Sequence, residues 1–305
     1  MSGTQDVLPV ATRAVRRERR RWPDWAQHLH GSEFAWAIAF VVPYIAVLVV
    51  FALYPVLYGL WTASDPALYA ELFDSDDYFD AVVTTLIYVG VGVNLNMFLA
   101  LLLSGYFMRK EWWIKALLVI SIVPWALPAQ VAFISWHWML IYPGFIDSLS
   151  WNIFGVDGPD WFHTYWTALG SMIIAYGWKY VPFWTLILLA GRMVIPQDLY
   201  DAAEIDGASG FRRFTHLVVP LLGNLYFVCT LLSTVWMLGD FNTPDMVTSG
   251  APDGSTDVLA TMGADLLLEK GNPQLGLATV VSAVPILIPI GILLMRRLQV
   301  REVQL

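Results

Sequence analysis

Six long apolar stretches constrain this chain more than any other feature of its sequence. A helix that crosses the hydrocarbon core of a bilayer needs about 20 consecutive residues that are mostly apolar. Six windows meet this requirement, approximately at 34–61, 81–107, 114–140, 166–193, 217–238 and 275–298. The sequence therefore predicts an all-α integral membrane protein with six transmembrane helices. Prolines inside these spans are tolerated because neighbouring helices can satisfy the freed carbonyls.

The composition agrees with a chain that is solvated by lipid. Hydrophobic residues make up 57% of the 305 residues and charged residues only 14%, whereas a soluble domain is usually about a quarter charged. The chain has one cysteine, Cys229, so an intrachain disulfide is excluded. The stretch at 34–61 is too long for the apolar region of a cleavable signal peptide, so we expect it to remain as a span.

Basic residues are segregated along the chain and set the expected orientation. Under the six-span model, 15 of the 17 Lys and Arg residues fall on one side of the membrane, and the opposite loops carry mostly acids. Because loops rich in Lys and Arg stay in the cytoplasm, the sequence predicts that both termini are cytoplasmic. The expected domains are a basic N-terminal segment (1–33), a transmembrane domain (34–298) and a short C-terminal tail (299–305).

One polar, helix-forming island lies between the fourth and fifth apolar stretches. Its residues 201–220 read DAAEIDGASGFRRFTHLVVP. Acids and alanines favour a helix at its start, and Gly207 permits a sharp bend because glycine readily adopts a positive φ. Phe211, Phe214 and Leu217 recur at helical spacing and predict one apolar face. A face of this kind either packs against a partner protein or lies on the membrane surface.

The island resembles the EAA loop of the permeases of ATP-binding-cassette (ABC) importers. The matching positions are Asp201, Ala202, Ala203, Asp206, Gly207, Ala208, Phe214, Leu217, Val219 and Pro220. Asp201 stands where the family has Glu, and Val219 stands where it usually has Leu. The resemblance implies a cytoplasmic coupling loop at about 194–220, between helices four and five, that docks on a separate ATPase. We expect Phe211 to join the docking residues.

The resemblance extends to carbohydrate-uptake permeases through residues 189–200 and 240–252. It implies a complex in the bacterial inner membrane, with a second permease subunit as heterodimer partner and a dimer of ATPase subunits. An extracytoplasmic substrate-binding protein would deliver the solute. ATP and Mg would be bound by the ATPase subunits, so no cofactor is expected in this chain. Sugars, oligosaccharides, polyols and glycerol-phosphate all remain open as the solute.

A polar and aromatic face in the fourth span is the candidate for the solute path. Tyr176, Lys179 and Tyr180 share this face, and Trp184 follows one turn later. Aromatic rings can stack on the C–H face of a sugar, and polar groups can bond its hydroxyls. A lysine inside a membrane is expensive and usually faces a cavity or a partner. The alternative is structural, with Lys179 paired to an acid on a neighbouring helix and the rings packed in the bundle.

Other polar positions carry weaker signals. Asn94 and Gln130 are further candidates for the solute path, although polar side chains in spans also hold helices together. The predicted outer loops at 142–165 and 240–273 are long enough to offer a docking surface to an extracytoplasmic partner. They can equally serve only to connect helices.

The sequence contains no catalytic or nucleotide-binding pattern. No two histidines have HExxH spacing, and no lysine is followed by Ser or Thr as a P-loop requires. We therefore expect a transport subunit without a metal site, and not an enzyme. The rival class is a self-sufficient secondary transporter, which would use an intramembrane ion-coupled carboxylate and inverted repeats. The spans are poor in acids, and no internal repeat is evident.

Overall fold

The structure, a computed structural model, describes residues 33–208, 210–285, 288–289 and 291–292. The chain divides into two compact units, Met1–Tyr58 and Gly59–Leu305. Every regular element within the described residues is a helix, as predicted. The two predicted terminal segments lie almost entirely outside the described residues. The prediction that both termini are cytoplasmic therefore concerns residues that the structure does not describe.

The described part of the first unit is one long apolar helix. Its elements are α2 (Glu33–Leu48), the π-helical turn η1 (Val49–Leu53) and the start of α3 (Tyr54–Thr62). The turn comes just before Pro55, which has no N–H to donate, so the helix widens there. The stretch Ile38–Thr62 is 25 residues long with a mean hydropathy of 2.5. It is long and apolar enough to cross a bilayer, as predicted for 34–61.

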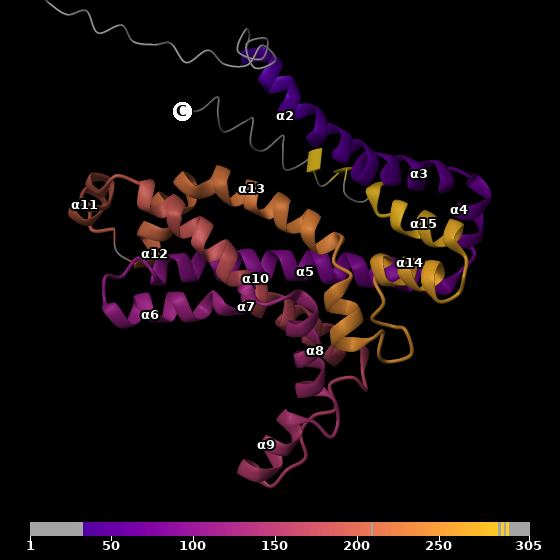
Figure 1. Cartoon of the computed structure of the whole chain (residues 1–305). Coiled ribbons are helices and arrows are strands. Elements are labelled where there is room, and N and C mark those ends of the chain that lie inside the picture. Colours follow the sequence, from indigo (N-terminus) through magenta and orange to yellow (C-terminus); the bar gives the residue numbers. More distant parts are fainter. Residues whose placement is uncertain (1–32, 209, 286–287, 290, 293–305) are drawn as a thin grey trace, which may run out of the picture. The chain divides into compact units, whose positions relative to one another are not determined.

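The second unit contains the other described helices. In chain order they are α4 (Pro66–Phe73), α5 (Asp76–Tyr106), α6 (Trp112–Ser121), α7 (Val123–Ala126), α8 (Ala129–Leu140), α9 (Phe145–Phe154), α10 (Tyr165–Val194), α11 (Gln197–Ile205), α12 (Gly210–Arg213), the π-helical turn η2 (Phe214–Val218), α13 (Val219–Leu238), the π-helical turn η3 (Pro244–Thr248), α14 (Leu259–Leu268) and α15 (Pro273–Val281). The long helices α5, α10 and α13 run alongside one another (Figure 1). At one end of them lie α11 and α12, and at the other lie α14 and α15.

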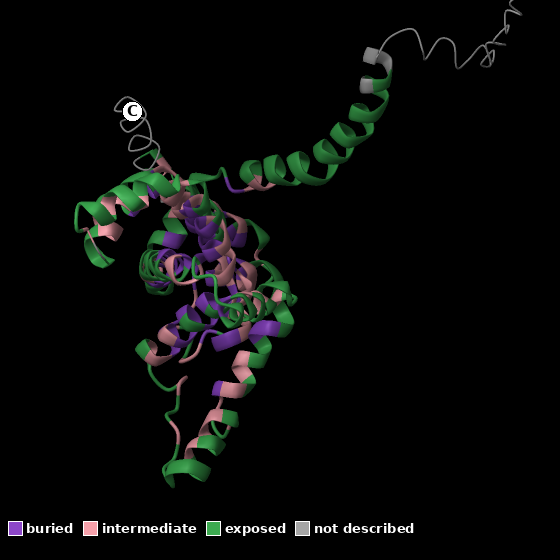
Figure 2. Cartoon of the chain, turned by 90° about the vertical axis from the view of Figure 1, so that its left-hand side faces the viewer, coloured by how far each residue is buried: buried purple, intermediate pink, exposed green. Residues whose placement is uncertain are grey.

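The core of the second unit lies where α5, α10 and α13 face one another. Tyr88, Met172, Trp184 and Met237 are fully buried there, and buried residues gather along the inside of the bundle in Figure 2. Gly92 of α5 lies directly against the Met237 side chain, where a Cβ atom would collide with it. Small residues of this kind let membrane helices approach closely, so Gly92 sets how near α13 comes to α5.

The third predicted span, 114–140, is not one straight helix, which corrects the prediction from the sequence. The stretch formed by α6 and α7 is bent by 99° from the one that begins with α8. The break falls around Leu127, between Pro124 and Pro128. Each proline lacks a backbone N–H, and the residue before a proline disfavours the helical conformation. The predicted outer loop that follows is also partly helical, because it contains α9.

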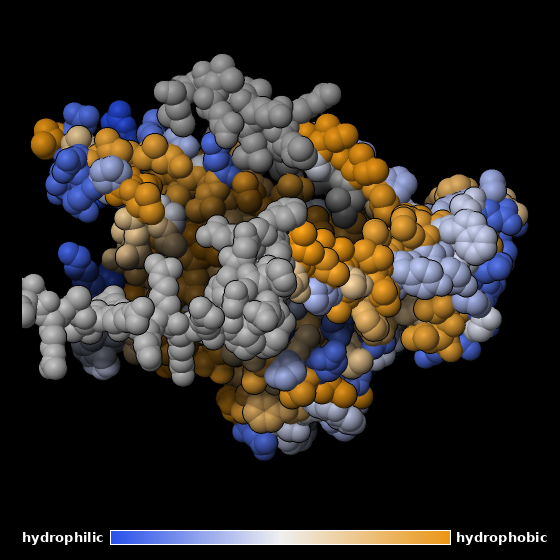
Figure 3. Space-filling model, turned by 45° about the horizontal axis from the view of Figure 1, so that its top comes forward, coloured by the Kyte–Doolittle hydropathy of each residue, from blue (hydrophilic) through white to orange (hydrophobic). Residues whose placement is uncertain are grey.

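Four of the described helices are long and apolar enough to cross a membrane, or five if the bent pair counts as one span. They correspond to the first five predicted spans. Of the sixth predicted span, 275–298, the structure describes α15 and a few residues beyond it, and the remainder lies outside the described residues. Figure 3 shows large hydrophobic patches on the face in view, with hydrophilic residues at its left and right margins and along its lower edge.

Candidate coupling segment and buried polar site

The polar island folds into two short helical arms joined by a tight turn. The first arm, α11, ends at Ile205, and Gly207 follows with φ of +71°. The Ala208 N–H donates to the Ala203 carbonyl at 2.8 Å across this turn. This bond satisfies a carbonyl that the end of α11 would otherwise leave free, in the pattern common where glycine follows a helix. The bend predicted at Gly207 is confirmed.

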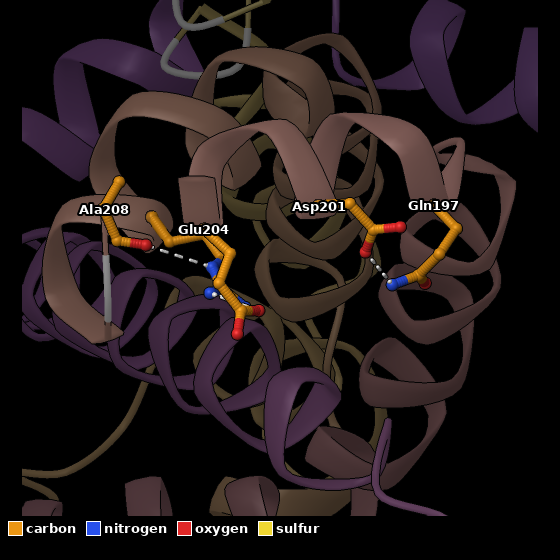
Figure 4. Close-up of polar contacts among 5 residues, drawn as sticks. Gln197, Asp201, Glu204 and Ala208 are labelled. Atoms are coloured by element: carbon orange, nitrogen blue, oxygen red, sulfur yellow. Dashed lines mark hydrogen bonds and ion pairs between the residues drawn. The ribbon is translucent and has the colours of Figure 1, made fainter. Parts of the chain in front are cut away.

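Side-chain contacts tie the two arms together across the turn (Figure 4). Arg213 Nη2 lies 3.4 Å from Glu204 Oε2, and Arg213 Nε donates to the Ala208 carbonyl at 3.3 Å. Within α11, Gln197 Nε2 donates to Asp201 Oδ1 at 3.0 Å. Exposed ion pairs contribute only about 0–1 kcal/mol, so these contacts fix the geometry of the turn more than its stability.

The apolar residues of the segment point in two directions. Tyr200 of α11 and Phe214 of η2 pack against the buried core of the second unit. Ile205 and Phe211 are 87% and 79% exposed. The single face predicted for Phe211, Phe214 and Leu217 is therefore divided, because Phe211 is exposed while the other two are half-buried.

Part of the motif lines a hollow on the surface of the segment. Asp201, Ala202, Asp206 and Pro220 are exposed, while Ala203 and Ala208 are half-buried. The hollow has a volume of about 330 Å³ and is lined by residues of both arms, among them Ala202, Ala203, Asp206, Ala208 and Arg212. An exposed concave surface with two exposed apolar side chains beside it suits protein docking.

A second site lies inside the bundle, around the carboxylate of Asp240. Tyr88 donates its hydroxyl to Asp240 Oδ2 at 2.8 Å, and the Thr243 N–H donates to Oδ1 at 3.3 Å. Asp240 is 8% exposed and has no ion-pair partner among the described residues. It lies just beyond the last residue of α13. Burial raises the pKa of Asp240, while the bonds from Thr243 and Tyr88 act in the opposite direction.

Aromatic rings line one side of this site. The Tyr176 ring lies 6.1 Å from that of Tyr88 and 4.5 Å from that of Tyr180. One turn further along α10, the Trp184 ring lies 5.2 Å from that of Trp236. The structure thus brings Tyr176 and Tyr180 together with Asp240, and places Trp184 beside them on the same helix.

Several buried polar atoms near these rings have no hydrogen-bond partner within the described residues. They are the Tyr176 hydroxyl, the Trp184 indole N–H, the Ser233 hydroxyl and both amide atoms of Asn96. Each buried polar group without a partner costs about 1–3 kcal/mol. Such groups come from α5, α10 and α13, and they offer donors and acceptors in the middle of an otherwise apolar bundle.

The other predicted path residues make different contacts. Lys179 is buried, and its Nζ donates to the carbonyl of Pro124 at 3.0 Å and to that of Leu127. These carbonyls lie at the break between α7 and α8, and Lys179 Nζ also lies 5.8 Å from the centre of the Tyr180 ring. The partners of Lys179 are therefore not the acid that the structural alternative assumed. Asn94 and Gln130 are exposed, and Asn94 donates to the Gly90 carbonyl of its own helix.

Sequence reasoning did not find the pairing of Tyr88 with Asp240. The two residues are 152 positions apart, so no local pattern links them. One signal was available: Tyr88, Gly92 and Asn96 recur every four residues along α5 and share one helix face. That face mixes a phenol and an amide with a glycine in an apolar span, which is typical of a helix packed against a polar site.

The chain is similar to known membrane transport proteins. Residues 96–301 match the model of the family described as binding-protein-dependent transport system inner membrane component. The chain is 30% identical to the trehalose/maltose transport system permease protein MalF of Thermococcus litoralis, a match that covers 73% of this chain and 80% of that protein. It is also 30% identical to the sulfoquinovosyl glycerol transport system permease protein SmoG of Agrobacterium fabrum, over 81% of this chain and 84% of that protein.

The fold is shared with a solved structure of a bacterial transporter. A chain of the bacterial alginate ABC transporter, in complex with an alginate pentasaccharide-bound periplasmic protein, superposes with a TM-score of 0.76. The superposition covers 88% of this chain and 95% of that chain, at 19% sequence identity. At that identity the likeness concerns the fold.

Proposed function

The chain belongs to the family of binding-protein-dependent transport system inner membrane components, and we propose that it imports a sugar or a sugar-like polyol. It is a permease subunit of an ABC importer and not an enzyme. This membership decides against the self-sufficient secondary transporter. Relatives that carry the names of trehalose, maltose and sulfoquinovosyl glycerol systems support the solute class.

The observation that carries the proposal is the buried polar site. A hydroxyl of the solute can donate to Asp240, and the free donors and acceptors of Tyr176 and Asn96 can bond further hydroxyls. The ring of Tyr180, which is half-buried, can stack on the C–H face of a sugar. Aromatic surface with a few placed polar groups is typical of small-molecule sites. We assign Tyr176, Tyr180 and Trp184 to the solute path on this basis.

We further propose six spans with both termini in the cytoplasm. The basic residues Arg109, Lys110, Arg212 and Arg213 belong to segments at the same end of α5 and α10 as α11. At the opposite end, the residues that line a hollow of about 290 Å³ include five acids and one lysine, namely Asp77, Asp80, Asp253, Asp257, Asp265 and Lys270. This polarity supports a cytoplasmic position for the coupling segment, because basic loops are retained inside.

The coupling segment is proposed to receive work from a pair of ATPase subunits, which bind ATP and Mg. The exposed side chains of Ile205 and Phe211 would be covered by an ATPase. A second permease subunit would complete the pathway, and an extracytoplasmic binding protein would deliver the solute. ATP binding would draw the coupling segments of the two permeases together and open the path outward, and hydrolysis would reset it.

Uptake by the reconstituted complex tests the solute class. Proteoliposomes that contain the permease and its partner subunits are given the binding protein and labelled trehalose, maltose, glycerol 3-phosphate or alanine. ATP is supplied on the side of the membrane that carries the ATPase subunits. We expect ATP-dependent uptake of a hydroxyl-rich solute and none of alanine. Tyr180→Ala should reduce uptake while ATPase stimulation persists, and Tyr44→Ala, the same change at a position of α2 that is 69% exposed, is the matched control. Uptake of alanine alone would refute the proposal.

A further inference from the structure

Arg192 is a buried arginine in the last turn of α10, four residues before Pro196, which precedes α11 at the start of the coupling segment. It is 6% exposed. Its Nε donates to Ser104 Oγ at 2.8 Å, and its Nη2 donates to the Leu101 carbonyl at 2.8 Å. Both acceptors belong to the last turns of α5. The guanidinium therefore fastens the end of α10 to the end of α5 with two directed bonds.

The same guanidinium also contacts the coupling segment. Its central carbon lies 5.8 Å from the centre of the Phe214 ring, within the range of a cation–π interaction. Phe214 belongs to the second arm of the segment, and Tyr200 of the first arm packs against the same buried cluster. Arg192 thus stands at the junction of α5, α10 and the coupling segment.

Among the described residues, no carboxylate forms an ion pair with Arg192. The ion pair found in this part of the chain joins Arg213 to Glu204. Buried arginines are usually paired with an acid, because an isolated buried charge is costly. The contacts of Arg192 are instead directional: a hydroxyl, a carbonyl and a ring face. The planar fork of a guanidinium fits such a set, whereas the ammonium of a lysine is a single point of charge.

The end of α5 is shaped to accept this side chain. Gly105 has no Cβ, and a Cβ there would lie only 3.3 Å from Arg192 Nη1. Ser104 Oγ accepts from Arg192 and donates to the Leu101 carbonyl at 2.7 Å. The three groups form a closed set in which Ser104 and Leu101 remain bonded to each other even if the arginine is removed.

We propose that Arg192 is a positioning residue that transmits the movement of the coupling segment to α5. This inference rests on the proposed function of that segment. When an ATPase displaces the segment, Phe214 and the end of α10 carry Arg192 with them, and its two bonds move the end of α5. Helix α5 also carries Tyr88 and Asn96, so the displacement reaches the buried polar site along one continuous helix.

A reporter on α5 tests this without reference to the solute. Leu86, 47% exposed on α5, is replaced by cysteine in a Cys229→Ala background, and the assembled complex is placed in vesicles. Maleimide labelling is timed with and without ATP plus orthovanadate. In the parent we expect ATP to change the labelling rate. In Arg192→Met this change should shrink about fivefold or more, while ATPase activity stays within about twofold of the parent.

Two further variants separate transmission from simple bracing. Arg109→Met is the matched control, since Arg109 also lies over a ring, that of Tyr106 at 5.5 Å, but is exposed. In the Arg109→Met complex, ATP should change the labelling rate as much as it does in the parent. Phe214→Leu keeps the apolar volume and removes the ring, and should weaken the response less than Arg192→Met. Arg192→Lys should resemble Arg192→Met, because a point charge cannot make both bonds in the same geometry.

Three results would overturn the inference. An Arg192→Met complex whose labelling responds to ATP like the parent would show that α5 moves without Arg192. A labelling rate that ATP does not change in the complex with the original Arg192 would show that α5 does not move. Loss of assembled complex in both Arg192→Met and Phe214→Leu would assign the contacts to stability. Failure of the proposed function is distinct, because it would appear as absent ATP-dependent sugar uptake in the parent itself.

Discussion

Gly207 is where the coupling segment turns, and its replacement isolates the contribution of backbone conformation. Its φ of +71° lies in the left-handed region, and a Cβ added there would meet no heavy atom of the described residues within 4 Å. A new side chain would therefore not clash, and the penalty would arise from the backbone alone. Holding a residue with a Cβ in this region costs roughly 1–2 kcal/mol, less for Asn and more for a β-branched residue.

We expect coupling to fall in the order Gly, Asn, Ala, Val at position 207. Because about 1.4 kcal/mol is a factor of 10 in an equilibrium, Gly207→Ala should reduce the population of the bent segment about tenfold, and Gly207→Val further. Gly207→Asn should lose about threefold, since Asn enters the left-handed region more readily. Gly207 is exposed and lies between α11 and α12, so insertion and folding of the chain should be unaffected.

The assay is the amount of sugar moved per ATP hydrolysed by the reconstituted complex, with the yield of assembled complex as the control. The order of the Asn and Ala variants is the decisive comparison. Asn is the larger side chain, so a steric cause would make Gly207→Asn the worse of the two, whereas backbone strain makes it the better. Coupling that follows side-chain size, or a Gly207→Val complex that transports normally, would refute the reasoning.

Three other predictions each concern a single residue. Lys179→Met leaves the carbonyls at the break without their donor and should lower the melting temperature of the complex; an unchanged melting temperature would contradict the bracing role. Because burial raises the pKa of Asp240 above that of the unfolded chain, the folded state holds this proton more tightly and loses stability as pH rises from about 4. Asp240→Asn should remove that part of the pH dependence of the melting temperature, and a parallel profile would argue against it. Phe211→Ala, at a side chain 79% exposed, should reduce co-purification of the ATPase without affecting insertion; full retention would exclude Phe211 from the docking surface.

The spans and the coupling segment could be predicted because the features that produce them are local in the sequence. Hydropathy over about 20 residues is enough to select a membrane helix, and four of the predicted spans appear as continuous helices. The bend at Gly207 follows from the residue itself. The break in the third span also has a local cause, because Pro124 and Pro128 flank it. Prolines elsewhere in the spans leave their helices continuous, as Pro182 does in α10. The presence of prolines alone was therefore not enough to predict the break.

The buried site depended on information that no local pattern holds. Tyr176 and Tyr180 were candidates from their helix face, yet their neighbour Asp240 lies two residues beyond the fifth predicted span, where no local pattern indicates that it is buried beside them. Lys179 shares the predicted face with the tyrosines, but its long side chain reaches the backbone of another span. Whether a polar side chain on a helix meets a cavity, a carbonyl or lipid depends on which helix lies opposite it.

The amino-acid sequence by itself determined that this chain is helical, has apolar helices long enough to span a membrane and contains one polar segment with a bend at Gly207, because these properties arise from runs of neighbouring residues. Only the tertiary structure decided that Lys179 caps the broken span, that Tyr88 bonds Asp240 and that Arg192 joins α10 to α5. These contacts depend on the rotation of each helix about its axis and on how closely helices approach. Both are decided by packing at positions such as Gly92 and Gly105, where the absence of a side chain makes room for a residue distant in the sequence.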